Sequence, residues 1–176
     1  MTWVRTGEDR ENLAHILASH SSNGPVLRGH LALYRALMFG DSPLSRAERE
    51  AVAVAVSATN NCHYCVVHHS DALAEASGDT VIAELVIAGK FSDLGPRLAA
   101  MCAYAVALTR DPRHTNESML APIGDAGLTA RELVDVNQVV AYFNYVNRVA
   151  QGLGVELEAT WPPGVRNRRE YRLGSG

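Results

Sequence analysis

Cysteine and aromatic residues are scarce in this 176-residue chain, and its net charge is small. Three cysteines, an odd number, argue against the disulfide framework of a small secreted domain. The formal net charge of −3 gives no reason to expect nucleic acid or an anionic membrane as a partner. The apolar run at residues 51–58 is far shorter than the ~20 residues that cross a bilayer, and no N-terminal stretch has the order of a secretory signal. We therefore expect a cytoplasmic protein.

Apolar residues make up 47% of the chain, and alanine and valine dominate among them. A chain of this length can build a hydrophobic core without disulfides or structural metal ions, and we expect a single domain over residues 1–160. Short breaks separate segments of helical periodicity, and no segment is convincing as a strand. The sequence therefore predicts an all-α fold. Trp161, Pro162 and Pro163 then begin an irregular C-terminal tail at residues 161–176.

Two capping boxes open two of the predicted helices. Ser45 is followed by Glu48, and Thr129 by Glu132, which is the spacing at which side chain and backbone cap each other at a helix N-terminus. The residues around the two boxes are similar, which indicates a duplicated helical unit. The second copy has valines where the first has a glutamate and two cysteines. The predicted helices cover residues 8–19, 25–38, 45–58, 62–76, 80–88, 96–109, 117–123 and 129–151.

A pair of cysteines three residues apart carries most of the chemical information. Cys62 and Cys65 lie one helical turn from each other, close enough for a disulfide, and His69 follows on the same helix face. Cys62 is expected in the first turn of its helix, where the positive end of the macrodipole lowers a thiol pKa. Because the thiolate is the reactive form, a thiol pair beside a base favours thiol redox chemistry.

Glu50 supplies a carboxylate from the preceding helix. It adjoins an apolar run where a charge is costly unless it is paired, and His69 is its natural partner. A carboxylate that accepts one imidazole N–H fixes the tautomer and makes the ring more basic. The predicted catalytic residues are therefore Cys62, Cys65, His69 and Glu50.

Three neighbouring side chains are candidates for tuning the thiols. His63 and Tyr64 lie between the cysteines, and His68 precedes His69. His68 points elsewhere on the helix and is expected to be a packing or surface residue. His63 is as readily exposed as it is a tuning residue, and Tyr64 either donates a hydrogen bond into the site or packs. Cys102 stands alone in an apolar helix and is expected to be buried filler.

Residues 44–76 resemble the core of the alkylhydroperoxidase D-like branch of the carboxymuconolactone decarboxylase family. The resemblance rests on Arg49-Glu50, the gap to Asn61-Cys62, the Cys-x-Tyr-Cys form and His68-His69. Residues 128–154 look like the C-terminal helix of the peroxidase-related members, through the run Phe143-Asn144-Tyr145-Val146-Asn147-Arg148. One position departs from the pattern, because better-characterised members have histidine directly before the second cysteine, where this chain has Tyr64.

The resemblance implies an alkylhydroperoxidase D-like helical fold that assembles into symmetric homo-oligomers. It also implies reduction of hydroperoxides through a Cys62/Cys65 dithiol–disulfide cycle, with Glu50 and His69 as the proton relay and without a cofactor or metal. An external dithiol, on a lipoyl carrier or a thioredoxin-like protein, would restore the thiols. We expect Cys65, nearest the base, to attack and Cys62, nearest the helix dipole, to resolve, and the opposite order stays open. The external dithiol is then expected to attack Cys62, the more exposed sulfur at the start of its helix.

Two other interpretations stay open. Cys62, Cys65 and His69, with Glu50 or His63, are the donor types of a tetrahedral zinc site, although structural zinc ligands usually come from separate loops. A non-catalytic helical oligomer that senses oxidation, or serves as a scaffold, would also use a reversible disulfide. Lactone decarboxylation is not expected, because that branch of the family generally lacks the cysteine pair.

Overall fold

The computed structural model describes residues 2–3 and 13–159. The predicted tail at residues 161–176 and residues 8–12 of the first predicted helix lie outside these ranges, and the described part of that predicted helix is helical only over His15–Ala18. Within them the chain forms helices and no strand, so the predicted all-α class is confirmed. The α-helices are α1 (His15–Ala18), α2 (Gly24–Phe39), α3 (Arg46–Thr59), α4 (His63–Ser77), α5 (Val81–Ile87), α6 (Pro96–Arg110), α7 (Ala121–Asp125) and α8 (Ala130–Gly152), and the 3-10 turns are η1 (Phe91–Asp93), η2 (Pro112–His114) and η3 (Glu117–Leu120).

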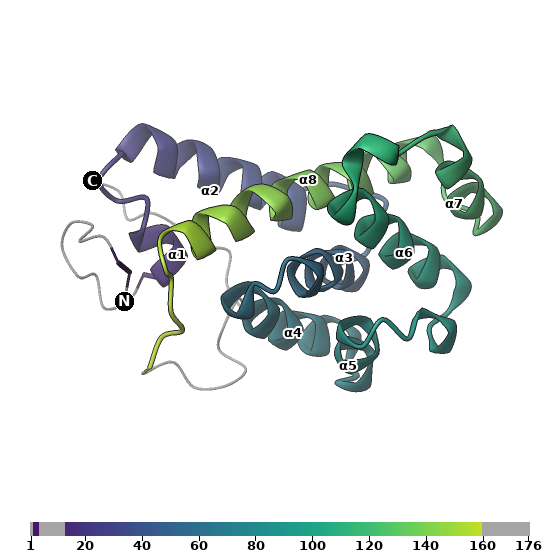
Figure 1. Cartoon of the computed structure of the whole chain (residues 1–176), viewed down its shortest axis with the longest axis horizontal. Helices are drawn as coiled ribbons and strands as arrows, with labels where there is room; N and C mark the ends of the chain where they lie inside the picture. Colours follow the sequence, from purple (N-terminus) through teal and green to yellow (C-terminus); the bar gives the residue numbers. More distant parts are fainter. Residues whose placement is uncertain (1, 4–12, 160–176) are drawn as a thin grey trace.

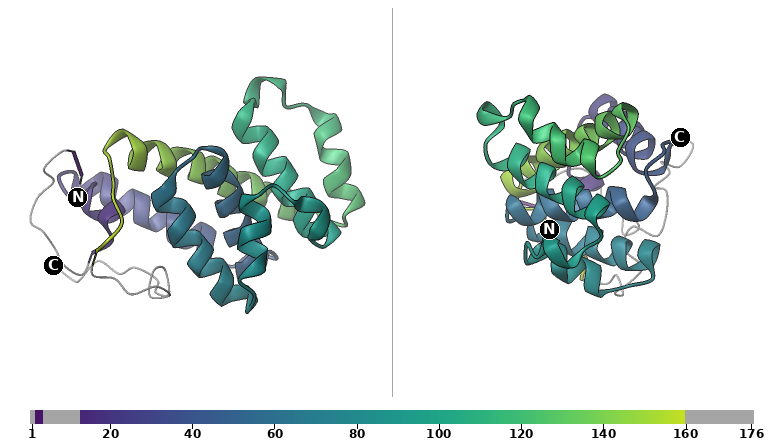
Figure 2. Two further views of the ribbon diagram at one scale, coloured as in Figure 1. Left: turned by 60° about the horizontal axis from the view of Figure 1, so that its bottom comes forward. Right: turned by 90° about the vertical axis from the view of Figure 1, so that its right-hand side faces the viewer.

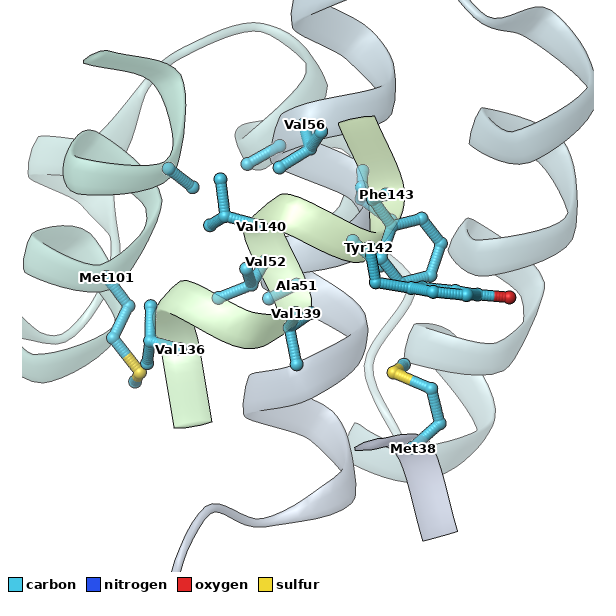
Figure 3. Packing of buried hydrophobic residues seen from close by; sticks show 14 of the residues in the cluster. Met38, Ala51, Val52, Val56, Met101, Val136, Val139, Val140, Tyr142 and Phe143 are labelled. Carbon is cyan, nitrogen blue, oxygen red and sulfur yellow. The ribbon is translucent and has the colours of Figure 1, made fainter. Parts of the chain in front are cut away.

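Helix α3 lies at the centre of the molecule, in contact with α4, α5, α6 and α8 (Figure 1). The predicted capping box begins it, with the side chains of Ser45 and Glu48 each bonded to the other's backbone N–H. Residues 51–56 of this helix are all buried, because small alanines and valines let the neighbouring helices approach closely. In Figure 3 the valines of α3 pack against those of α8, with Met101 of α6 at one side.

Helix α8 begins with the second predicted capping box, formed by Thr129 and Glu132. After the first box the chain breaks between α3 and α4, but after the second box it continues as one helix. The positions that match the two cysteines, Val146 and Val149, therefore lie inside α8 rather than at a helix start. Only the first of the two similar segments thus brings a helix N-terminus to the buried interior.

The chain beyond α8 crosses the start of α4 as an extended segment, which we call the covering segment (residues 153–158). Figure 1 shows it descending from the end of α8 past α1, and Figure 2 shows the same course from another side. It starts at Gly154, whose φ of +61° suits glycine and whose missing side chain leaves room for the Trp3 ring. None of the helices in the described ranges combines the length and apolar character needed to cross a membrane.

Candidate active site

A tight turn between α3 and α4 sets the position of the cysteine pair. Asn61 has a φ of +53°, a left-handed conformation that asparagine tolerates better than most residues. The backbone N–H of the next residue, Cys62, then donates to the carbonyl of Ser57 at 2.9 Å. Cys62 is the N-cap of α4, one position before the expected first turn, and Cys65 lies one turn into the helix.

Side-chain amides fasten this turn to α8. Asn60 donates through its side chain to the side-chain oxygens of Asn144, at 3.1 Å, and Asn147, at 3.0 Å. Asn147 is fully buried and donates in turn to the hydroxyl of Ser57 at 3.2 Å. An unpaired buried amide destabilises the folded state. The hydrogen bonds of this network therefore favour one position of α8 beside the thiols.

Both thiols of the pair are buried. The exposed fraction is 1% for Cys62 and 3% for Cys65, and neither is in a disulfide. The expectation that Cys62 would be exposed is therefore wrong. A helix start is often open to solvent, but here Val155 and other apolar residues of the covering segment pack against the cysteines.

The two thiols differ in acidity because one donates a hydrogen bond to the other. The pKa of Cys62 is lowered by hydrogen bonds from the side chain and backbone of Cys65, which outweigh the effect of burial. The pKa of Cys65 is raised well above its ordinary value by the same hydrogen bond, by burial and by the charge of Cys62, with a smaller opposing hydrogen bond to Asn147. Of the two thiols, Cys65 is therefore the weaker acid.

Three ionisable side chains near the cysteine pair, Arg46, Glu50 and His69, contact one another in series. The predicted contact between Glu50 and His69 is present, with 2.6 Å between the carboxylate and imidazole Nδ1. Glu50 is fully buried, and its other oxygen is ion-paired with Arg46, so the carboxylate has the charged partner that burial requires. With Nδ1–H donating to Glu50, the other nitrogen, Nε2, becomes the basic one. The ring edge-packs on Phe143, with 4.5 Å between ring centroids, and this contact fixes its orientation.

A second buried carboxylate, Glu158 of the covering segment, contacts the adjoining face of α4, which carries Tyr64 and His68. It accepts hydrogen bonds from the hydroxyl of Tyr64 at 2.8 Å, from His68 Nε2 at 2.8 Å and from the backbone N–H of His15 at 2.7 Å. Tyr64 and His68 also stack, with 4.3 Å between ring centroids. Burial alone would raise the pKa of Glu158, but the hydrogen bonds and the charge of His68 lower it to about 2.

The remaining predicted residues lie away from this group. His63 is exposed, so it does not face the buried thiols. Cys102 is fully buried in α6, where burial raises the pKa of its thiol to about 12, as expected for a packing residue. Sequence reasoning missed Arg46 and Glu158. Arg46 stands four residues before Glu50, a helical ion-pair spacing that was available as a signal.

A small cavity reaches one sulfur of the pair. Cys65 and His69 line it on the α4 side, whereas Cys62 does not. His30 and Tyr34 of α2 and Tyr142 of α8 also line it. The cavity volume is about 30 Å³, room for one or two water molecules. Cys65 thus has a substrate-sized space beside the base.

The geometry gives no support to the zinc interpretation. Within residues 2–3 and 13–159, no three histidine, cysteine, aspartate or glutamate side chains are grouped so that they could hold a metal ion. The cysteine pair is accompanied by one histidine of the same helix, His69, which is hydrogen-bonded to Glu50.

Comparison with known proteins shows which families and structures this chain resembles. Residues 25–107 match the carboxymuconolactone decarboxylase family. The chain is similar to an uncharacterized peroxidase-related protein from Silicibacter sp. TM1040, with 32% identity over 82% of this chain and 76% of that one, and a TM-score of 0.78. No protein of curated function matches the sequence.

More distant structures share the fold. An uncharacterized peroxidase-related protein from Ralstonia eutropha JMP134, an alkylhydroperoxidase AhpD core, has a TM-score of 0.83 at 24% identity and covers 90% of this chain and 93% of its own. The debrominase Bmp8, in complex with 2,3,4-tribromopyrrole, has a TM-score of 0.75 at 16% identity and covers 84% of this chain and 78% of its own. The chain therefore belongs to the carboxymuconolactone decarboxylase family and has the fold of the alkylhydroperoxidase AhpD core.

Proposed function

We propose that the protein is a thiol peroxidase that reduces hydroperoxides through a Cys62/Cys65 dithiol–disulfide cycle. The observation that carries the proposal is the shared cavity, in which Cys65 faces the same small space as His69. Cys62 is hydrogen-bonded to Cys65, and Glu50 supports the base from behind. Since a debrominase has the same fold, the reaction is argued from these side chains and not from the fold.

In the first step Cys65 attacks the peroxide. His69 Nε2 takes the thiol proton, and the sulfur forms a bond to one peroxide oxygen while the O–O bond breaks. The departing oxygen receives the proton from His69 and leaves as water or an alcohol, and Cys65 becomes a sulfenic acid. Glu50 stabilises the transient imidazolium. Because the pKa of Cys65 is high at rest, this step depends strongly on the base.

In the second step Cys62 attacks the sulfenic sulfur. A disulfide bond forms, the S–O bond breaks, and hydroxide leaves with a proton as water. The lowered pKa of Cys62 makes its thiolate available for this attack. The cysteine that is the weaker acid thus meets the peroxide, and the stronger acid resolves the product.

An external dithiol completes the cycle. Its thiolate attacks one sulfur of the disulfide, and its second thiol then displaces the enzyme sulfur, leaving the carrier oxidised and both cysteines reduced. The sulfur with the lower pKa leaves faster, so attack on Cys65 with Cys62 leaving is favoured. A lipoyl carrier or a thioredoxin-like protein fits this role, and we propose that the enzyme works as a homo-oligomer in a reducing, cytoplasmic compartment.

The test is to add one equivalent of hydrogen peroxide to the reduced, metal-free protein and to map its cysteines by mass. A Cys62–Cys65 disulfide should form within seconds, and His69→Ala should prevent it. His63→Ala is the matched control, because His63 is an exposed histidine of the same helix. Thiols that remain unchanged would contradict the proposal. A disulfide that forms without turnover by any dithiol, together with a change of oligomeric mass, would favour the redox-sensing alternative.

Sulfenic-acid trapping separates the two roles. With Cys62→Ser the label should appear at Cys65, since no resolving thiol remains. With Cys65→Ser the remaining Cys62 should stay unlabelled, because it does not line the cavity. Labelling only at Cys62 would reverse the assignment of attacking and resolving cysteines.

A further inference from the structure

The cavity beside Cys65 has a polar lining residue that the thiol chemistry does not use. His30 of α2 lines the cavity together with Cys65 and is 6% exposed. Its Nε2 lies 3.4 Å from the hydroxyl of Tyr142. Its Nδ1 is buried and has no hydrogen-bond partner among the described residues. A buried nitrogen without a hydrogen-bond partner destabilises the folded protein unless a ligand or a water molecule forms a hydrogen bond with it.

The surroundings of His30 hold its ring in place. It stacks on His20, with 4.4 Å between ring centroids and an interplanar angle of 25°. His20 is itself held, because its Nδ1 lies 2.8 Å from the carbonyl of Ile16 and its Nε2 lies 3.4 Å from the hydroxyl of Tyr145. Burial, and to a lesser degree the charge of His20, lower the pKa of His30 to about 4. At neutral pH His30 is therefore an uncharged imidazole.

We infer that His30 binds the departing oxygen of the peroxide and that the substrate is hydrogen peroxide or a hydroperoxide with a very small organic group. The inference names the substrate class of the proposed site and rests on the proposed peroxidase function. It stands on three observations: His30 Nδ1 has no partner among the described residues, His30 and Cys65 line the same cavity, and the volume of that cavity is about 30 Å³. A space of this size holds two linked oxygens but not an aromatic hydroperoxide.

The chemistry gives the imidazole a specific task. While Cys65 forms its bond to one oxygen, the O–O bond pair moves onto the other oxygen, which gains negative charge. With Tyr142 donating to Nε2, the Nδ1–H of His30 can donate to that oxygen until His69 delivers the proton. A fixed donor in a site with little water stabilises such a charge more strongly in the transition state than in the bound peroxide.

The first test compares peroxides of different size with wild-type protein under single turnover, following thiol loss. The second-order rate constant for hydrogen peroxide should exceed that for cumene hydroperoxide by at least about tenfold. Ile16→Ala, which removes volume from the cavity wall, should narrow this difference. Equal or faster reaction with cumene hydroperoxide would overturn the inference but leave the peroxidase function standing. Failure with every hydroperoxide would refute the function itself.

The second test removes the donor. His30→Leu should slow thiol oxidation by hydrogen peroxide about 10²-fold, the size expected for one lost charge-stabilising donor. His30→Gln, which can still offer an N–H, should recover part of this loss. His114→Leu is the control, because His114 is an exposed histidine far from the cavity in sequence. An unchanged rate in His30→Leu would overturn the inference. If that variant fails to fold, the rate of His30→Gln relative to wild type and the size comparison decide the question.

Discussion

Glu158 should make the folded protein sensitive to acid, and the expected size follows from its contacts. The carboxylate is buried and accepts hydrogen bonds from His68, Tyr64 and the backbone of His15, and its pKa is lowered from 4.5 to about 2. One pKa unit corresponds to about 1.4 kcal/mol. The difference between folded and unfolded states is therefore about 3 kcal/mol.

The direction of the pH effect follows from the lowered pKa. Above pH 4.5 the carboxylate is ionised in both states, so its full contribution to stability is present. As the pH falls from 4.5 toward 2, the unfolded chain binds a proton that the folded protein does not. The contribution is then lost. Glu158→Gln should consequently lower the free energy of unfolding by up to about 3 kcal/mol at pH 7 and by much less near pH 2.

Urea unfolding of the reduced protein, followed by circular dichroism from pH 7 to pH 2.5, measures this difference. Glu84→Gln is the matched control, because Glu84 is an exposed glutamate on α5. It should change the unfolding free energy by less than about 0.5 kcal/mol at any pH. The reasoning is refuted if Glu158→Gln costs less than about 1 kcal/mol at pH 7, or if its cost is the same at both ends of the pH range.

The remaining predictions concern the relay, the thiols and the core. Glu50→Gln should slow peroxide-dependent thiol loss about 10²-fold by stopped flow, since His69 loses its charged partner, and a wild-type rate would contradict the relay. Thiolate absorbance should show one thiol that titrates below its ordinary pKa of 9, and Cys62→Ser should abolish that transition while leaving the helical signal intact. Phe143→Ala, at a fully buried position, should cost about 3–5 kcal/mol in urea unfolding; a cost below 1 kcal/mol would mean that the helices close around the gap.

The helical fold could be predicted closely because its signals are local. Capping at Ser45 and Thr129 and breaks at glycine and proline placed most helix ends within one residue of those observed. The segment at 117–123 was less well predicted, because it forms a 3-10 turn that leads into the short helix α7. Short segments with proline and glycine carry weak periodicity, so their helix type depends on tertiary contacts.

The site could be predicted only where its parts are close in sequence. The cysteines, His69 and Glu50 lie within twenty residues or so on two adjoining helices, and spacing alone brought them together. Glu158 lies 90 residues from His68 in the sequence, and no pattern around Glu158 predicts that contact. The burial of Cys62 was missed for the same reason, since the residues that cover it follow α8.

The covering segment has a consequence for the rate at which the disulfide can be reduced. Its apolar side chains pack on Cys62 and Cys65, and Glu158 ties it to α4. No dithiol on a protein carrier can reach either sulfur until this segment, or another part of the cavity wall, moves aside. Reduction should therefore reach a ceiling as the carrier concentration increases, because the opening rate becomes limiting. Oxidation by small peroxides that fit the existing cavity does not need this opening. The opening rate therefore limits reduction of the two sulfurs but not their oxidation.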